Sequence, residues 1–259
     1  MNDWKPDTGN WNLVRRPLAA VLALLATSQL DAQALRAIVA VGARYAPAPD
    51  ERTRQRDLDD MRRLRFNVVS LGDAEGRQGR LAFLDRVIAN APYPGVELSG
   101  TEEIAIVPVK DGGDDLAARA WSALARGARG VLFDDWAALA RNTAALAAAA
   151  EFTEAVTRNA ALYAPLRPRT ADLRTAAAPE TVEVRLLESA AAIVIIAINH
   201  TPARQSLDVG FPRDIPEAIW RNMVTGASVS FVMGADGPAY KRSLAPHEVL
   251  VLAINKTLR

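Results

Sequence analysis

The pattern of apolar and polar positions divides the chain into two parts with different periodicities. In the first part, short apolar runs alternate with segments in which apolar residues recur every three or four positions. This is the pattern of strands that alternate with amphipathic helices. In the second part, from about residue 180, the helical spacing is absent, and short alternating or β-branched runs are separated by turns. The pattern therefore predicts an α/β domain followed by an all-β domain.

The first part contains four predicted strands, each followed by a predicted helix. The expected strands are 37–41, 66–71, 104–109 and 131–133. The expected helices are marked by Leu58, Met61 and Leu64; by Leu81, Leu84, Val87 and Ile88; by Leu116, Ala120 and Leu124; and by one long alanine-rich stretch from 137 to 163. Strands that alternate with helices form parallel sheets. We therefore expect a shortened, barrel-like (β/α) sheet of about four units.

A polar connector with three prolines follows this α/β part. Beyond it, the pattern predicts strands at 182–186, 192–198, 206–209, 229–232 and 249–254. Several short strands with regular turns are typical of a small antiparallel β-sandwich. The expected division is a signal peptide at 1–34, the barrel-like domain at 35–165, a linker at 166–179 and the sandwich at 180–259.

The N-terminal segment has the features of a secretory signal peptide. Arg15 and Arg16 precede an apolar run from 18 to 26, and Ala32-Gln33-Ala34 offers a cleavage site. Such a segment is removed from the mature protein. The run is too short for the roughly 20 apolar residues that a membrane helix needs. We expect a periplasmic or secreted protein without a membrane span after cleavage; an uncleaved anchor and a buried helix are the alternatives.

Composition and motifs narrow the classes of chemistry. The chain has no cysteine, two histidines and a net charge of +1. Disulfides and thiolate sites are therefore excluded, and the histidines have no carboxylates at ligand spacing, so we expect no metal and no cofactor. Arginine is scattered among acids without a basic stripe, which argues against nucleic acid. The chain contains neither a Gly-x-Ser-x-Gly elbow nor a phosphate-binding glycine loop.

Three groups of residues carry a resemblance to a known family. They are Gly42, Tyr45 and Pro47 with "DLDDMRRLRFNVV" from Asp57; "RAWSALARGARGVLFDDW" from Arg119; and Asn199-His200, Trp220, Thr225-Gly226 and "LAPHEVLVL" from Leu244. The first two groups resemble the first strand and helix and the last helix and strand of beta-galactosidases with the clan A (β/α)8 fold. The third resembles the sandwich behind many glycosidase barrels. Arg65 stands where those enzymes usually have a glycine.

The resemblance implies a glycoside hydrolase acting on an oligosaccharide or polysaccharide, but the family's two catalytic glutamates have no counterpart. The acid/base glutamate follows an asparagine, and this chain has no Asn-Glu pair. The nucleophile ends the seventh strand, where Lys110 stands. Two hypotheses follow. One is an exported glycoside hydrolase with relocated or lost carboxylates, so that its being an enzyme is uncertain. The other is a noncatalytic saccharide-binding or envelope assembly protein on the same fold.

Functional side chains on such a fold lie at the carboxyl ends of the strands, where the β-α loops meet. Candidate residues were chosen by this rule. The catalytic candidates are Asp73, Asp134 and Asp135, and the substrate-binding candidates are Arg44, Tyr45, Lys110 and Trp136. In the structural alternatives, Asp134 and Asp135 cap the helix that follows, Asp73 belongs to a turn, Arg44 forms a structural ion pair, Tyr45 covers the end of the sheet and Trp136 packs in the core.

The small number of strands leads to one further expectation. Four parallel strands cannot close a barrel, so two strand edges remain that invite pairing. We expect a homodimer through these sheet edges, or an edge that is covered by the sandwich.

Overall fold

The first part of the chain forms a six-stranded sheet with a parallel centre. The computed structural model describes residues 39–71, 80–87, 96–97, 104–109, 113–170, 173–215, 219–234 and 236–256. The strand order is β4-β3-β2-β1-β6-β5, and neighbours among β2, β1, β6 and β5 run parallel. The bounds are β1 (Ala40–Tyr45), β2 (Val68–Leu71), β3 (Arg80–Phe83), β4 (Val96–Glu97), β5 (Ile104–Val107) and β6 (Gly130–Phe133). The four parallel strands predicted from the sequence are confirmed.

The first strand lies inside the parallel part of the sheet, between β2 and β6, and β2 and β5 are the outer parallel strands. This arrangement needs a close approach of β1 and β2 at Gly42. A Cβ atom at this position would lie 1.9 Å from the carbonyl oxygen of Val68. Only a residue without a side chain fits there, which gives a physical reason for the glycine in the first strand.

Helices cover one face of this sheet. Their bounds are α2 (Glu51–Arg63), α3 (Leu116–Ala125), α4 (Trp136–Arg141), α5 (Thr143–Arg158) and α6 (Ala160–Tyr163). Leu58 and Met61 of α2 and Phe152 of α5 are fully buried in the core that they share with the sheet. Periodic burial of one helix face accounts for their apolar spacing. The opposite face of the sheet carries a smaller cluster around Val68, Leu81 and Leu132.

The helix predicted from Leu81, Leu84, Val87 and Ile88 is wrong. Residues 80–83 instead form β3, antiparallel to β2, and only the short 3-10 helix η1 (Leu84–Arg86) follows. Ile88 lies outside the described residues. The open edge of β2 supplies unpaired backbone groups, and a four-residue apolar run satisfies them better as a strand than as an isolated turn of helix. The β2 edge is therefore extended by β3 and β4 within the same chain. The homodimer stays a prediction.

The single long helix predicted for 137–163 is also wrong in its continuity. It is divided into α4, α5 and α6 at Asn142 and Asn159. Asn142 has extended dihedral angles, and its side-chain oxygen accepts a hydrogen bond from the backbone N–H of Ala145 at 3.0 Å. Asparagine competes for backbone hydrogen bonds and so favours a cap over a helix interior.

The second part forms two antiparallel sheets that share a core. One sheet has the order β13-β12-β16-β10-β9-β7 and the other the order β14-β15-β11-β8. The bounds are β7 (Arg167–Pro168), β8 (Arg174–Thr175), β9 (Val182–Glu188), β10 (Ala192–Asn199), β11 (Gln205–Gly210), β12 (Ile219–Asn222), β13 (Ser228–Ser230), β14 (Val232–Gly234), β15 (Gly237–Leu244) and β16 (Val249–Asn255). The apolar pattern did not predict β12 or β15, and it indicated a single strand where β13 and β14 form. The expected linker contributes β7 and β8.

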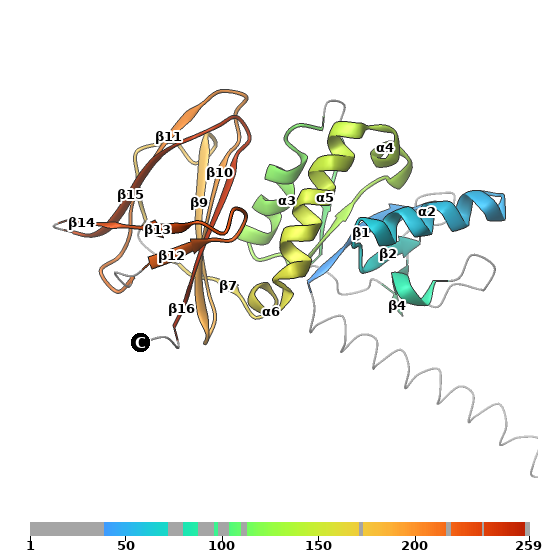
Figure 1. Cartoon of the computed structure of the whole chain (residues 1–259), viewed down its shortest axis with the longest axis horizontal. Helices are drawn as coiled ribbons and strands as arrows, with labels where there is room; N and C mark the ends of the chain where they lie inside the picture. Colours follow the sequence, from blue (N-terminus) through green and yellow to red (C-terminus); the bar gives the residue numbers. More distant parts are fainter. Residues whose placement is uncertain are drawn as a thin grey trace, which may run out of the picture.

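The helical layer packs directly against the antiparallel sheet that contains β9, β10 and β16. Figure 1 shows α3 and α5 between the parallel sheet and the sheet that contains β9 and β10. Along β10, Ile193 and Ile195 face the core between the two antiparallel sheets, whereas Val194 and Ile196 belong to the core under the helices. Every residue of β10 is buried. The continuous apolar run of this strand follows from burial on both faces.

Candidate functional site

The carboxyl ends of the parallel strands bring two of the predicted site residues to the same end of the sheet. Ala43 pairs with Phe133 in the register of β1 and β6, and Arg44 and Asp134 each follow by one position. Ala43 and Phe133 belong to the core under the helices. Because side chains alternate along a strand, Arg44 faces the side of the sheet away from the helices, and Asp134 directly follows the last residue of β6. Both side chains are half-buried.

Asp134 is held by the backbone around it. Its Oδ1 atom accepts a hydrogen bond from the backbone N–H of Val109 at 2.7 Å, and its own N–H donates to the carbonyl of Val107 at 3.1 Å. The carboxylate therefore ties the segment after β5 to the end of β6. Among the described residues, no hydrogen bond to its other carboxylate oxygen is present.

The next two residues serve the local structure. Asp135 is exposed and is the N-cap residue of α4, accepting a hydrogen bond from the N–H of Ala138 at 3.1 Å. Trp136 begins the same helix and is only 3% exposed. Its ring packs edge to face against Phe66, with centroids 6.2 Å apart. Trp136 thus has almost no surface on which a sugar ring could stack.

Tyr45 and Ser70 complete this edge of the sheet. Tyr45 is buried on the helix side, and its hydroxyl lies 3.2 Å from Oδ2 of Asp57 in α2. Ser70 pairs with Arg44 in the register of β1 and β2, is 1% exposed, and its Oγ has no hydrogen-bond partner in the structure. The sequence analysis did not single out Ser70, because one hydroxyl inside an apolar run gives no signal of its own. Asp73 and Lys110 lie outside the described residues.

A groove of about 560 Å³ lies between the helical layer and the two antiparallel sheets. One wall comes from α3 and α5 and from the residues just before α3, and the other from the ends of β12, β15 and β16. Its lining includes Asp114, Trp121, Glu151, Arg242, His247 and Glu248. Pockets that bind small molecules commonly have this size and lie between domains. None of these residues was predicted as part of a site.

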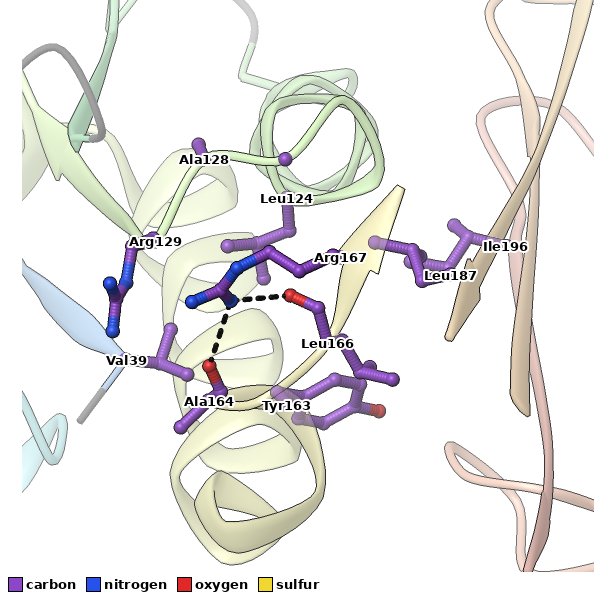
Figure 2. A pocket seen from close by; sticks show the side chains of 11 residues that line it. Val39, Leu124, Ala128, Arg129, Tyr163, Ala164, Leu166, Arg167, Leu187 and Ile196 are labelled. Carbon is purple, nitrogen blue, oxygen red and sulfur yellow. Dashed lines mark hydrogen bonds between the residues drawn. The ribbon is translucent and has the colours of Figure 1, made fainter. Parts of the chain in front are cut away.

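A second, much smaller cavity lies where α3, α6 and the strands β9 and β10 meet. It has a volume of about 20 Å³, enough for about one water molecule. Figure 2 shows Tyr163, Leu166, Leu187 and Ile196 around it, with Arg167 donating hydrogen bonds to the carbonyls of Ala164 and Leu166. The Tyr163 hydroxyl is buried without a partner, and this burial raises its pKa. The cavity is too small for a sugar ring.

A charged cluster joins the helical layer to the strand β9. Glu183 of β9 has a side chain that is 3% exposed. It accepts hydrogen bonds from Ser122 Oγ at 2.7 Å, Arg126 Nε at 2.9 Å and Arg185 Nε at 3.0 Å, and Nε2 of His200 lies 3.0 Å away. Burial alone would raise the pKa of Glu183, but these hydrogen bonds outweigh it and lower the pKa to about 2. The cluster fixes α3 against the antiparallel sheet.

The described residues show no group of three or more histidine, cysteine or acidic side chains that could hold a metal ion. His247 lies in a turn with a positive φ of 53°. In the described part of the chain, no helix combines the length and apolar character that crossing a membrane requires. The expected signal peptide lies outside the described residues.

No protein-family model and no curated protein matches the chain in sequence. Parts of solved glycosidase structures are similar to it. A GH27 β-L-arabinopyranosidase from Geobacillus stearothermophilus matches 60% of this chain and 37% of its own at 11% identity, with a TM-score of 0.39. For a GH30 endoxylanase from Clostridium papyrosolvens C71 the shares are 57% and 39%, with 12% identity and a TM-score of 0.37.

A GH42 beta-galactosidase, Gan42B from G. stearothermophilus, is similar over a shorter stretch. The match covers 34% of this chain and 10% of that chain at 14% identity, with a TM-score of 0.23. The chain thus spans well under half the length of each of these three proteins.

Proposed function

We propose that this chain is an exported carbohydrate-binding protein that holds an oligosaccharide or polysaccharide without cleaving it. One observation carries the proposal: the two described carboxylates at the strand ends are both used in holding the backbone. Asp134 accepts from the N–H of Val109, and Asp135 caps α4. Glycoside hydrolysis needs two free carboxyl groups about 5 to 9.5 Å apart, one with a raised pKa.

The binding face that this proposal assigns lies over the ends of β1, β2 and β6. Arg44 supplies several N–H donors, and Asp134 has one carboxylate oxygen left to accept. Donors and acceptors placed side by side match the neighbouring hydroxyl groups of a sugar. The saccharide class itself comes from the resemblance of the strand and sandwich residues to glycosidases.

A glycoside hydrolase is the second candidate, and the remaining oxygen of Asp134 favours it. Asp73 follows β2 by two positions in the sequence, so it is the residue that could supply a second carboxyl group in that mechanism. One carboxyl group would then act as an acid and the other as a base or nucleophile.

The test is a combined binding and turnover screen of the mature protein. Calorimetry measures the binding of neutral and charged oligosaccharides. Release of the phenol measures the cleavage of aryl glycosides. The variants are Asp134→Asn, which can still accept from Val109, and Asp73→Asn. Asp135→Asn is the matched control, because asparagine caps a helix about as well as aspartate.

We expect binding without turnover, and weaker binding in Asp134→Asn than in the control. Turnover that is lost in Asp134→Asn or Asp73→Asn would establish the hydrolase instead. A folded protein that neither binds nor cleaves any saccharide in the panel would overturn both candidates.

A further inference from the structure

The groove between the helices and the sandwich has the properties of a second ligand site, separate from the strand ends. Its volume of about 560 Å³ falls within the range of about 300 to 1,000 Å³ that is typical of small-molecule sites. Trp121 and Phe152 form its base, where they pack edge to face with centroids 5.3 Å apart. Its rim is polar. Such a combination of an apolar base and polar groups from two walls is typical of a binding site rather than of a packing defect.

The two walls of the groove are fixed relative to each other. Helix α3 contributes Trp121 to the groove. The hydroxyl group of the next residue, Ser122, donates a hydrogen bond to Glu183, which lies in the sheet that forms the opposite wall. Arg126, after the end of the same helix, adds an ion pair to Glu183 at 2.9 Å. The helix therefore cannot shift without breaking a buried charged cluster. A groove whose width is set in this way is preformed, which lowers the entropic cost of binding.

The charges that line the groove do not cancel. Arg242 is matched by Glu248, with Nη2 and Oε1 2.5 Å apart. Asp114 and Glu151 are exposed on the helical wall, and neither makes an ion pair or hydrogen bond within the described part of the chain. Counting these four groups, the groove carries two negative charges that are not offset. Opposite charge on a ligand would be attracted into it.

We propose that this groove binds a saccharide that carries protonated amino groups, as in an oligomer of glucosamine. The saccharide class in this inference rests on the proposed function. The inference adds where the ligand binds and that the ligand carries positive charge. Asp114 and Glu151 accept charge-assisted hydrogen bonds from the ammonium groups, which are stronger than those between neutral groups. The hydroxyl groups of the sugar reach the polar side chains of the sandwich wall.

Titration calorimetry with two matched probes tests this inference. A glucosamine tetramer carries four amino groups, and its N-acetylated counterpart has the same backbone without the charges. The groove variant is Asp114→Asn with Glu151→Gln. The matched control is Glu154→Gln, which lies on the same helix α5 and pairs with Arg158 instead of lining the groove.

We expect the glucosamine tetramer to bind at least about fivefold more tightly than the acetylated tetramer, as two surface charge contacts provide. The groove variant should lose this preference, and the control should keep it. The preference should also shrink as salt rises from about 50 mM to about 300 mM, because exposed charges are screened.

Equal affinity for both probes, or a preference that persists in the groove variant, would overturn the inference. If neutral sugars then still bind, and if this binding depends on Asp134, the proposed function would remain supported. If the protein is folded and neither tetramer nor any saccharide of the wider panel binds, the proposed function falls and the inference falls with it.

Discussion

Arg65 has a backbone conformation that is unfavourable for arginine. It follows α2 with a φ of 60°, a left-handed conformation that side chains with a Cβ atom avoid. The N–H of Arg65 donates to the carbonyl of Arg62 at 2.9 Å, and that of Phe66 donates to Met61 at 3.1 Å. These two bonds form a Schellman motif, in which glycine is the usual residue at this position.

Replacing Arg65 by glycine should therefore stabilise the protein. We expect Arg65→Gly to raise the free energy of unfolding by about 1 kcal/mol. Glycine has no Cβ atom, so the left-handed conformation no longer places one too close to the following carbonyl oxygen. Urea unfolding followed by circular dichroism measures the change. Arg65→Ala is the control and should give no such gain. A midpoint for the glycine variant at or below that of the wild type would contradict this explanation.

The family resemblance indicated a glycine-like position at Arg65. The sequence could not predict Ser70 or Glu183. Glu183 stands between two valines in an alternating strand, which is the pattern of a residue that faces solvent. Here both faces of the sheet are covered, so the alternating polar position is buried and paired. Alternation reports which residues share a face, and not what covers that face.

At the scale of elements, local spacing predicted where most segments lie, but not which structure every segment adopts. The strands β1, β2, β5 and β6 and the helices α2 and α3 were predicted within a few residues. The run from Leu81 to Ile88 has helical spacing, yet β3 forms there because the edge of β2 needs a hydrogen-bonding partner. Such a partner is set by the tertiary structure and is not visible in the local pattern.

The break between α4 and α5 depends on one side chain. Asn142 caps α5 through its hydrogen bond from Ala145. We expect Asn142→Ala to lower the free energy of unfolding by about 1 kcal/mol, as the loss of an N-cap does. Asn142→Asp preserves the cap and should stay within about 0.5 kcal/mol of the wild type. Equal thermal midpoints for the alanine and aspartate variants would show that the cap does not stabilise this helix.

At the scale of the whole molecule, the Glu183 cluster couples the helical layer to the antiparallel sheets. The folded pKa of Glu183 is about 2, against an ordinary value of 4.5. A lowered pKa means that the ionised carboxylate stabilises the fold above about pH 4.5. This contribution is lost as the pH falls from 4.5 towards 2.

Removing the charge should remove this pH dependence. We expect Glu183→Gln to lower the free energy of unfolding at neutral pH by about 3 kcal/mol, because the neutral amide loses the charge-assisted hydrogen bonds that hold the pKa of Glu183 at about 2. The difference between wild type and variant should shrink as the pH falls from about 4.5 to about 2. Urea midpoints across this range measure it, with Glu154→Gln as an exposed control. A constant difference across the range would contradict the assigned role.

The parallel part of the sheet has the order β2-β1-β6-β5, and its barrel-like character stays a prediction. The arrangement of the two parts against each other was not predictable. It depends on the second apolar face of β10 and on Glu183, and a pattern read along one segment does not identify the segment that packs against it. The groove between the helical layer and the antiparallel sheets could not be predicted from the sequence for the same reason.

The most direct test of the account is calorimetry of the mature protein with unlabelled oligosaccharides, followed by mass spectrometry of the ligand recovered afterwards. We predict that at least one oligosaccharide binds in a saturable manner, that Asp134→Asn weakens this binding relative to Asp135→Asn, and that the recovered ligand has its original mass. Recovery of shorter products, or the absence of saturable binding to a folded protein, would contradict a saccharide-binding protein that does not cleave its ligand.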